Sequence, residues 1–263
     1  VRVGKRLTGL TEPGQQVLPI IERLLADSDN LRNASRDFSE QGVGPLSIAA
    51  THSQARYALP SAVKDFRTLF PQVTLNLHQG SPQQVADMLI SGEADIGIAT
   101  EALASYDQLV TLPCYRWTHS VVVPHGHPLL NGTPLTLQGL ARFPLITYDA
   151  GYTGRSHIDE AFAKEGLSPL IVLSAMDADV IKTYVELGMG VGVVASIAYD
   201  EDRDRNLSAI DAGHLFAVNM TRLAFRRGAF LRSYSYAFIE TFAPPLTRQV
   251  VEQAMRSDAP EAP

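Results

Sequence analysis

The sequence predicts an α/β fold made of two similar, Rossmann-like lobes preceded by a long helix. Apolar segments of strand length alternate with amphipathic segments of helix length over residues 46–100, and the same order returns over residues 145–195. A third observation is an internal echo, in which residues 88–99 and 184–195 each combine a helix end, a glycine and an apolar strand. Two such lobes leave a crevice between them, where small ligands usually bind in open α/β sheets.

Composition supports a folded protein with a large core. The chain has 263 residues, of which 45% are hydrophobic, enough for one large domain or for two domains of about 100 residues each. Lysine and arginine number 22 against 28 aspartates and glutamates, so the net charge is −6. This charge is opposite in sign to the basic surface that nucleic-acid binding requires. We therefore expect most of the chain to make no contact with DNA.

Cysteine content and hydropathy indicate the compartment. Cys114 is the only cysteine, which excludes an internal disulfide framework and suits a reducing compartment. The amino end lacks the apolar core of a signal peptide, and no segment approaches the roughly 18 apolar residues that a membrane helix needs. We expect a cytoplasmic protein that neither enters a membrane nor is exported.

The amino-terminal segment predicts a hairpin, a helix and a flexible joint. Residues 1–10 favour a short hairpin, residues 11–14 a break, and residues 39–45 a polar, glycine-rich joint. Between them, residues 15–38 have the spacing of an amphipathic helix. Its apolar stripe consists of Val17, Ile20, Ile21, Leu24, Leu25 and Leu31. The stripe fits either a core helix or a linker helix that pairs with its copy in a dimer, and the residue types alone leave both open.

Strands and helices alternate after this joint. The first lobe is predicted to have strands at residues 46–50, 73–79 and 96–99 and helices at residues 54–70 and 83–90. The second is predicted to have strands at residues 145–148, 171–174 and 191–195 and helices at residues 157–164 and 178–187. A strand at residues 221–230, a helix over residues 234–255 broken by Pro244 and Pro245, and a polar tail over residues 257–263 complete the prediction.

The turn Thr51-His52-Ser53-Gln54 is the leading candidate for a binding site. It follows an apolar strand and opens a helix, whose first amide groups have no partner within the helix and can bind an anion. The hydroxyls of Thr51 and Ser53 and the amide of Gln54 add donors without a full positive charge, which suits reversible binding of a sulfate or carboxylate group. Helix capping explains one hydroxyl, but two hydroxyls together with Gln54 favour a binding role.

Three further positions could complete this site. Residues 151–156 join a strand to a helix in the second lobe, where glycines permit close backbone approach and Thr153 offers a hydroxyl. Thr100 follows an apolar strand in the same way, although capping alone would also explain it. Trp117, the only tryptophan, could form a wall of the crevice or pack in the core. These positions predict a pocket of neutral donors from both lobes.

Signals of catalysis and of metal binding are weak. Residues 188–192 follow a helix rather than a strand, so their glycines do not form a dinucleotide-binding loop, and no Gly-x-Ser-x-Gly elbow occurs. Cys114 is predicted to be a buried thiol, since nothing in the sequence places an activating histidine beside it. His125-Gly126-His127 is expected to be a surface turn, because no cysteine or carboxylate stands at ligand spacing. We predict no enzyme activity, no metal and no cofactor.

Several segments spread over nearly the whole chain carry a family signature. One is AATHSQARYALP at residues 49–60, and the others are residues 78–82, 98–103, 112–115, 153–156, 177–184, 190–193, 225–227 and 230–234. These segments resemble LysR-type transcription regulators, in particular the CysB-like subgroup that controls cysteine and sulfur assimilation genes. Residues 4–14 are similar to the wing of that family's winged helix-turn-helix.

The resemblance implies three regions. Residues 1–14 would be a remnant of the wing, without the recognition helix, so promoter DNA would be a partner of the full-length protein only. Residues 15–44 would be the dimerising linker helix and hinge. Residues 45–263 would be a periplasmic-binding-protein-like (type 2) effector domain. Its first lobe would span about 45–115 with a return from about 221, and its second lobe about 120–220.

The resemblance also implies an effector-sensing function. The family's effector residues fall at Thr51, Ser53, Gln54, Thr100 and Thr153 of this chain. Relatives commonly have threonine in place of Ser53, which leaves ligand choice open. The small anionic effectors implied are N-acetylserine, O-acetylserine, sulfate, thiosulfate and adenosine phosphosulfate, and the implied assembly is a homodimer or homotetramer. The alternative with the same architecture is a solute-binding protein of a transport system.

Overall fold

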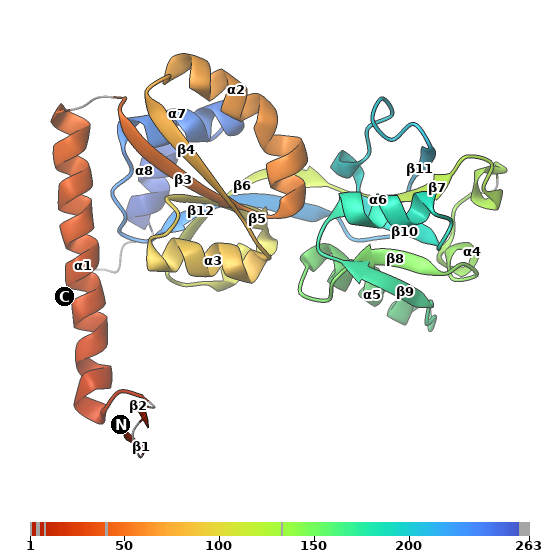
Figure 1. Cartoon of the computed structure of the whole chain (residues 1–263), viewed down its shortest axis with the longest axis horizontal. Coiled ribbons are helices and arrows are strands. Elements are labelled where there is room, and N and C mark those ends of the chain that lie inside the picture. Colours follow the sequence, from red (N-terminus) through yellow and green to blue (C-terminus); the bar gives the residue numbers. More distant parts are fainter. Residues whose placement is uncertain (1, 4–5, 8, 40–41, 133, 258–263) are drawn as a thin grey trace.

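Two five-stranded sheets, each covered by helices, form two lobes, and a long helix stands at the outer end of the first lobe (Figure 1). The computed structural model describes residues 2–3, 6–7, 9–39, 42–132 and 134–257. The predicted α/β fold with two lobes is confirmed. Within the described residues, no helix is both long and apolar enough to cross a membrane.

The first lobe is built on a sheet of strand order β4-β3-β5-β12-β6. Its strands are β3 (Gly44–Ala50), β4 (Val73–Gln79), β5 (Ile96–Thr100), β6 (Leu109–Trp117) and β12 (Asn219–Arg226). β3 is parallel to β4 and β5, whereas β12 is antiparallel to both of its neighbours, β5 and β6. The late strand β12 therefore completes a sheet whose first strand, β3, begins 175 residues earlier.

Helices bury apolar clusters on both faces of this sheet. On one face lie the π-helical turn η1 (Gln54–Ala58), α2 (Leu59–Leu69), α7 (Ser233–Phe242) and α8 (Arg248–Ser257). Their cluster includes Phe66 and Phe238, whose rings meet edge to face. On the other face, α3 (Pro82–Ser91) and the short helix η2 (Glu101–Ser105) cover a second cluster. A capping box at Ser81 starts α3, and Gly92 with φ +79° ends it, as the glycine in the sequence predicts.

The second lobe is built on a sheet of strand order β11-β7-β10-β8-β9. Its strands are β7 (His119–Pro124), β8 (Leu145–Tyr148), β9 (Ile171–Ala175), β10 (Val191–Ala195) and β11 (Leu207–Asp211). β8, β9 and β10 run parallel, and β7 is antiparallel to β10 and β11. The helices are η3 (Pro128–Leu130), α4 (Leu137–Leu140), α5 (Thr153–Lys164), α6 (Ala178–Glu186) and η4 (Ser196–Ala198). α5 and α6 cover opposite faces and bury separate apolar clusters.

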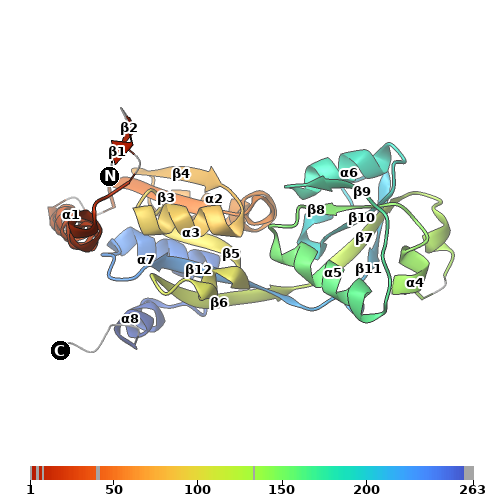
Figure 2. The same cartoon turned by 90° about the horizontal axis from the view of Figure 1, so that it is seen from below.

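The chain passes between the lobes twice. It leaves the first lobe from β6 to β7 through Thr118, and it returns from β11 to β12 over residues 212–218. Figure 2 shows these two connections as the narrow part of the molecule. Two thin connections allow the lobes to change their relative orientation, so contacts across the crevice determine how they sit.

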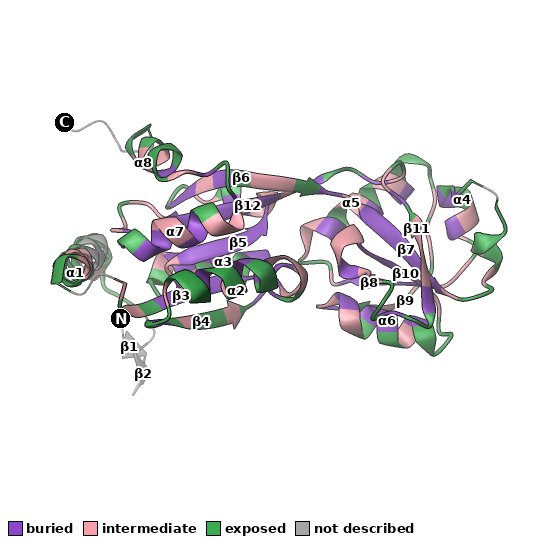
Figure 3. Cartoon of the chain, turned by 90° about the horizontal axis from the view of Figure 1, so that it is seen from above, coloured by how far each residue is buried: buried purple, intermediate pink, exposed green. Residues whose placement is uncertain are grey.

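The helix α1 (Glu12–Ser39) packs on the first lobe mainly through polar contacts near its carboxyl end. The Asn30 side chain donates a hydrogen bond to the carbonyl of Gly228 and accepts one from the amide of Phe230. The carboxylate of Asp37 accepts a hydrogen bond from the amide of Ser233. The predicted apolar stripe stays exposed, with Leu24 at 64% and Leu31 at 73% (Figure 3). Ahead of α1, β1 (Arg2–Val3) and β2 (Arg6–Leu7) pair antiparallel, which confirms the predicted hairpin.

Several predicted elements have the expected bounds, and others differ for local reasons. The strands predicted at residues 73–79, 145–148 and 191–195 are confirmed. The break expected at residues 11–14 is wrong, because α1 begins at Glu12. Proline is tolerated in a first turn, and Thr11 caps it by accepting from the Gly14 amide. The helix expected from residue 157 begins at Thr153. Most of the tail expected at residues 257–263 lies outside the described residues, although Ser257 ends α8.

Three strands, β6, β7 and β11, have no counterpart among the predicted elements. β6 contains Pro113 and the exposed Arg116, which break the expected alternation, and proline is tolerated there because β6 is an edge strand. The strand expected at residues 221–230 is β12, which starts two residues earlier and stops at Arg226. The helix expected over residues 234–255 is indeed broken, between α7 and α8.

We predict that Gly190→Ala destabilises the second lobe. A Cβ at Gly190 would lie 2.5 Å from the carbonyl oxygen of Pro144, a backbone atom that cannot step aside. The cost should be about 2 kcal/mol, as for an overpacked core. The matched control is Gly151→Ala, where a Cβ would meet nothing within 4 Å. Urea unfolding that gives both variants the same stability would contradict the prediction.

Candidate functional site

A small pocket lies between the two lobes at the ends of their strands. It is lined by the six residues predicted from the sequence, Thr51, Ser53, Gln54, Thr100, Trp117 and Thr153, and by three others, Tyr148, Tyr152 and Gly154. Its volume is about 30 Å³, room for about one or two water molecules. The structure therefore brings together residues that are up to 102 positions apart, from Thr51 to Thr153.

The first wall of the pocket is the turn that follows β3. The amide of Thr51 donates to the carbonyl of Ile98, which ties this turn to the end of β5. The helical segment then opens at His52, so its first amides face the strand ends. Thr100 does not use its hydroxyl to cap the helix that follows it, so the capping alternative is not supported for this residue.

Gln54 is held in one orientation behind this turn. Its side-chain carbonyl accepts a hydrogen bond from the hydroxyl of Tyr115, and its amide nitrogen donates to the hydroxyl of Thr221 at 3.1 Å. Both partners stand beside a β-bulge, where Cys114 is the extra residue of β6 opposite β12. Because the carbonyl is occupied, the remaining free hydrogen of the Gln54 amide is the group available to a ligand.

Thr100 and Thr153 meet across the crevice. Their hydroxyl oxygens lie 2.6 Å apart, a hydrogen bond between the end of β5 in the first lobe and the start of α5 in the second. Trp117 forms the wall between them and also packs against the core of the second lobe. Its indole N–H is buried and has no hydrogen-bond partner among the described residues. An oxyanion in the pocket could accept from both hydroxyls.

Two tyrosines of the pocket were not among the predicted site residues. Tyr148 ends β8, in the position that Thr100 has at the end of β5, so the same strand-end reasoning could have found it. Its hydroxyl accepts from the amide of Ala195, and burial raises its pKa to about 12, so it stays protonated. No lining residue is a lysine, arginine, aspartate or glutamate, and the pocket therefore consists of neutral hydrogen-bonding and apolar groups.

Cys114 lies away from the pocket and is half-buried rather than fully buried, a partial correction of the prediction. Burial raises the pKa of its thiol to about 12, which keeps it in the poorly nucleophilic protonated form. The turn at residues 125–127 is exposed as expected. Both ring nitrogens of His125 are occupied, one by Ser208 and the other by the carbonyl of Arg205.

Three possible metal ligands, His52, Asp177 and Asp179, come within 4.8 Å of one another at the edge of the crevice. This grouping was not visible in the sequence, because His52 belongs to one lobe and the aspartates to the other. The carboxylate of Asp179 already binds Arg56 at 2.9 Å and Lys182 at 3.3 Å. Two neighbouring positive charges oppose a divalent cation, so the grouping does not favour a metal site.

His119 is fully buried behind the pocket, between Trp117 and Phe216. Burial lowers its pKa to about 4, and the nearby His157 adds to the effect. In the unfolded chain the ordinary value of 6.5 returns, so only the unfolded state gains a proton between these values. The stability that the neutral ring supports is complete above pH 6.5 and is lost as the pH falls toward 4.

We predict that His119→Leu flattens the pH dependence of stability. The wild type should lose about 3 kcal/mol more than the variant between pH 6.5 and pH 4, from the size of the pKa shift. Urea unfolding at several pH values measures this difference. The control His125→Gln changes an exposed histidine and should keep the wild-type slope. Equal slopes for the wild type and His119→Leu would contradict the prediction.

Known sequences and structures are similar to this chain over most of its length. A family model described as the LysR substrate binding domain matches residues 39–244. The HTH-type transcriptional regulator SsuR of Burkholderia cenocepacia is 57% identical over 256 residues, covering 97% of this chain and 83% of the relative. The regulator CysB of the same organism is 53% identical over 258 residues, covering 98% and 82%.

Solved structures agree with the sequence comparisons. The crystal structure of the cofactor-binding domain of the Cbl transcriptional regulator has 50% sequence identity and a TM-score of 0.78, and the match covers 82% of this chain and 94% of that one. The effector-binding domain of QuiR in complex with shikimate has a TM-score of 0.68 at 18% identity, covering 77% of this chain and 97% of that one. The second match shows a shared fold only.

Proposed function

This chain belongs to the LysR family, and we propose that it is the effector-sensing part of a transcription regulator of sulfur, cysteine or sulfonate metabolism genes. The observation that carries this proposal is the hydrogen bond between Thr100 and Thr153, which joins the two lobes inside a pocket of neutral donors. A ligand that replaces this bond contacts both lobes at once and so senses their arrangement.

The chemistry of the pocket supports a small anion as the effector. The hydroxyls of Thr51 and Ser53 and the second hydrogen of the Gln54 amide are able to donate. Neutral donors bind an oxyanion without a fixed charge that would stay buried after release. The candidates remain N-acetylserine, O-acetylserine, sulfate, thiosulfate and adenosine phosphosulfate. All of them are larger than the pocket, whose volume is about 30 Å³, so binding needs a wider pocket.

Signal transmission follows from the two-lobe arrangement. An effector shifts the lobe equilibrium only by its differential affinity for the two arrangements. In a homodimer or homotetramer, this shift would change the spacing of the DNA-binding heads carried by the full-length protein. The hairpin and α1 at the amino end fit the wing and the linker helix of such a regulator.

Two other functions are less well supported. A solute-binding protein of a transport system has the same architecture, but the family model and the named relatives are those of transcription regulators. An enzyme would need an activated nucleophile or a cofactor loop, and the half-buried Cys114 keeps its proton. A cytoplasmic location is the one that suits a regulator of promoter DNA.

We predict that isothermal titration calorimetry detects binding of at least one of the five candidate effectors. Thr100→Val should then weaken that binding about tenfold, since the bound ligand loses one buried hydrogen bond to the Thr100 hydroxyl. The control Thr68→Val removes an exposed hydroxyl on α2, far from the pocket, and should leave the affinity unchanged. Binding of none of the five, or equal affinities for wild type and Thr100→Val, would count against the proposed site.

A second prediction concerns self-association through α1. Leu24→Glu places a charge in the exposed apolar stripe and should weaken association at least tenfold. Gln15→Glu adds the same charge on the opposite face of the helix, by its helical spacing, and serves as the matched control. Sedimentation across a range of protein concentrations measures both. A wild-type chain that stays monomeric at every concentration would rule out this role of α1.

A further inference from the structure

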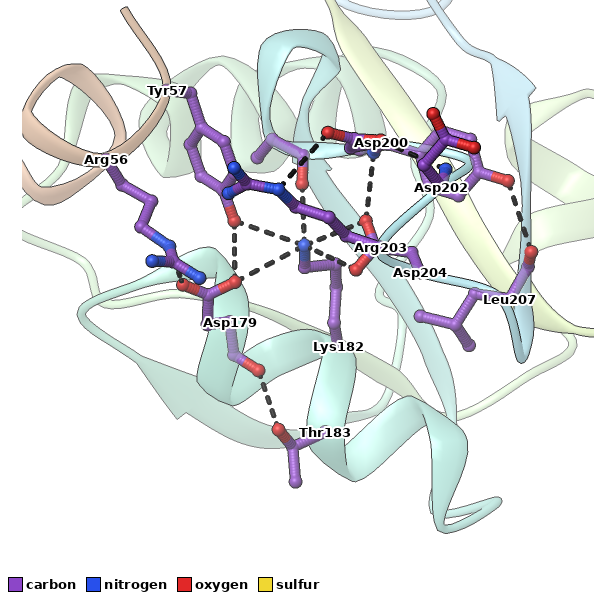
Figure 4. A network of polar contacts seen from close by, with 12 residues as sticks. Arg56, Tyr57, Asp179, Lys182, Thr183, Asp200, Asp202, Arg203, Asp204 and Leu207 are labelled. Atoms are coloured by element: carbon purple, nitrogen blue, oxygen red, sulfur yellow. Dashed lines mark hydrogen bonds and ion pairs between the residues drawn. The ribbon is translucent and has the colours of Figure 1, made fainter. Parts of the chain in front are cut away.

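A charged network joins the two lobes beside the pocket without lining it (Figure 4). Arg56 and Tyr57 extend from η1 of the first lobe, and Asp179 and Lys182 extend from α6 of the second. The Tyr57 hydroxyl donates to Asp179 at 2.6 Å, and the Lys182 ammonium donates to the same hydroxyl at 3.1 Å. The guanidinium of Arg56 lies 2.9 Å from the other oxygen of Asp179. These four residues form the inter-lobe latch.

The half of the latch in the second lobe is held by hydrogen bonds within that lobe. The Lys182 ammonium is buried and donates to both carboxylate oxygens of Asp204, at 2.8 and 2.9 Å, and to the carbonyl of Ala198 at 2.8 Å. Asp204 in turn accepts from the amide of Asp200. The cation is therefore neutralised within its own lobe, and Tyr57 of the other lobe is a fourth acceptor that shares the three ammonium hydrogens.

The half in the first lobe is coupled to the pocket by the shape of η1. This π-helical turn begins at Gln54, whose amide is fixed by Tyr115 and Thr221 at the pocket, and it carries Arg56 and Tyr57 toward α6. π-helical turns are rare and are often found at functional sites. One short segment thus presents a donor to the pocket and two side chains to the other lobe, so movement of either contact displaces the other.

We infer that the inter-lobe latch holds the lobes in the closed arrangement and that its release opens the pocket. The Thr100–Thr153 bond closes the crevice at one point, and the latch closes it at a second point on a different element. Enlarging the 30 Å³ pocket by separation of the lobes breaks the bonds from Tyr57 and Arg56 to Asp179. The latch therefore sets how often the pocket is open, whatever the ligand is.

The local electrostatics favour a latch that stays charged at neutral pH. Burial acts to raise the pKa of Asp179, but the bond from Tyr57 and the charges of Lys182 and Arg56 outweigh it and lower that pKa below its usual value. Burial and the neighbouring Asp179 also raise the pKa of the Tyr57 hydroxyl, so it remains a donor. At neutral pH Asp179 therefore stays ionised and the Tyr57 hydroxyl stays protonated, as their hydrogen bond requires.

The chain contains a built-in probe for this movement. Trp117 is the only tryptophan, and it is 8% exposed in the wall between the lobes. Quenching of its fluorescence by acrylamide therefore reports how often the crevice opens, without any effector. The test compares Tyr57→Phe, which removes only the bridging hydroxyl, Arg56→Ala, which removes the ion pair, and the double variant. None of these side chains lines the pocket.

The expected result is a Stern–Volmer constant about twofold higher in each single variant and highest in the double variant, because the open population grows. The matched control is Arg248→Ala, which removes an ion pair of 2.7 Å to Glu252 within α8 of the same lobe, and it should quench like the wild type. Folded variants, judged by unchanged circular dichroism, that quench like the wild type would overturn the latch.

The outcome is independent of effector identity. If Tyr57→Phe unfolds, Arg56→Ala decides the matter, since the Arg56 side chain is half exposed. Unchanged quenching in that variant would then refute the inference. Failure of all five candidate effectors to bind would remove the proposed ligand class and leave the latch standing. Normal effector binding together with unchanged quenching would support the proposed ligand class and refute the inter-lobe latch.

Discussion

The two connections between the lobes are the constraint on which the rest of the structure depends. Each lobe has its own sheet and its own apolar clusters on both faces, so each is stabilised largely without the other. What joins them is the passage through Thr118, the return into β12, polar contacts across the crevice, and the packing of Tyr57 and Tyr115 on an apolar cluster of the second lobe. Because these contacts are few, each has a large share in deciding the lobe arrangement.

Charge is divided between the pocket and its surroundings in a way that suits a sensor. The pocket is lined by neutral groups, whereas the charges of Arg56, Asp179 and Lys182 meet outside it. A buried charge within the pocket would lose its partner each time a ligand left, at a high desolvation cost. Charges that pair across the lobes can instead exchange their partners for water when the lobes separate. Neutral groups are thus available for ligand binding, whereas charged groups on neighbouring residues hold the lobes together.

The long helix α1 has a related division between its two ends. Asn30, Asn33 and Asp37 bind the segment at residues 228–233, which fixes the carboxyl half of the helix to the first lobe. The exposed leucines of the stripe have no such partner among the described residues. Burial of this stripe against a second copy would remove apolar surface from water, which is the main driving force for association.

The local sequence determined the elements and much of the pocket. The strand at residues 73–79 is readable because its apolar side chains alternate with polar ones, and the strand at residues 191–195 because it is a short continuous apolar run. Thr51, Thr100 and Thr153 were identifiable as candidates because each stands where an apolar strand gives way to a helix or loop. The carboxyl ends of parallel strands meet at one edge of a sheet, so local position is enough to suggest a shared site.

Tertiary structure alone decided which of these positions touch and what holds them. β6 was not predicted, since Pro113 disrupts its pattern, yet it supplies Tyr115 and Trp117 to the site. The bond from Tyr57 to Asp179 joins residues 122 positions apart, and the π-helical turn that presents Tyr57 leaves no mark in the hydrophobic spacing. Sequence periodicity records which face of an element is buried, but it contains no information on which distant side chain lies opposite.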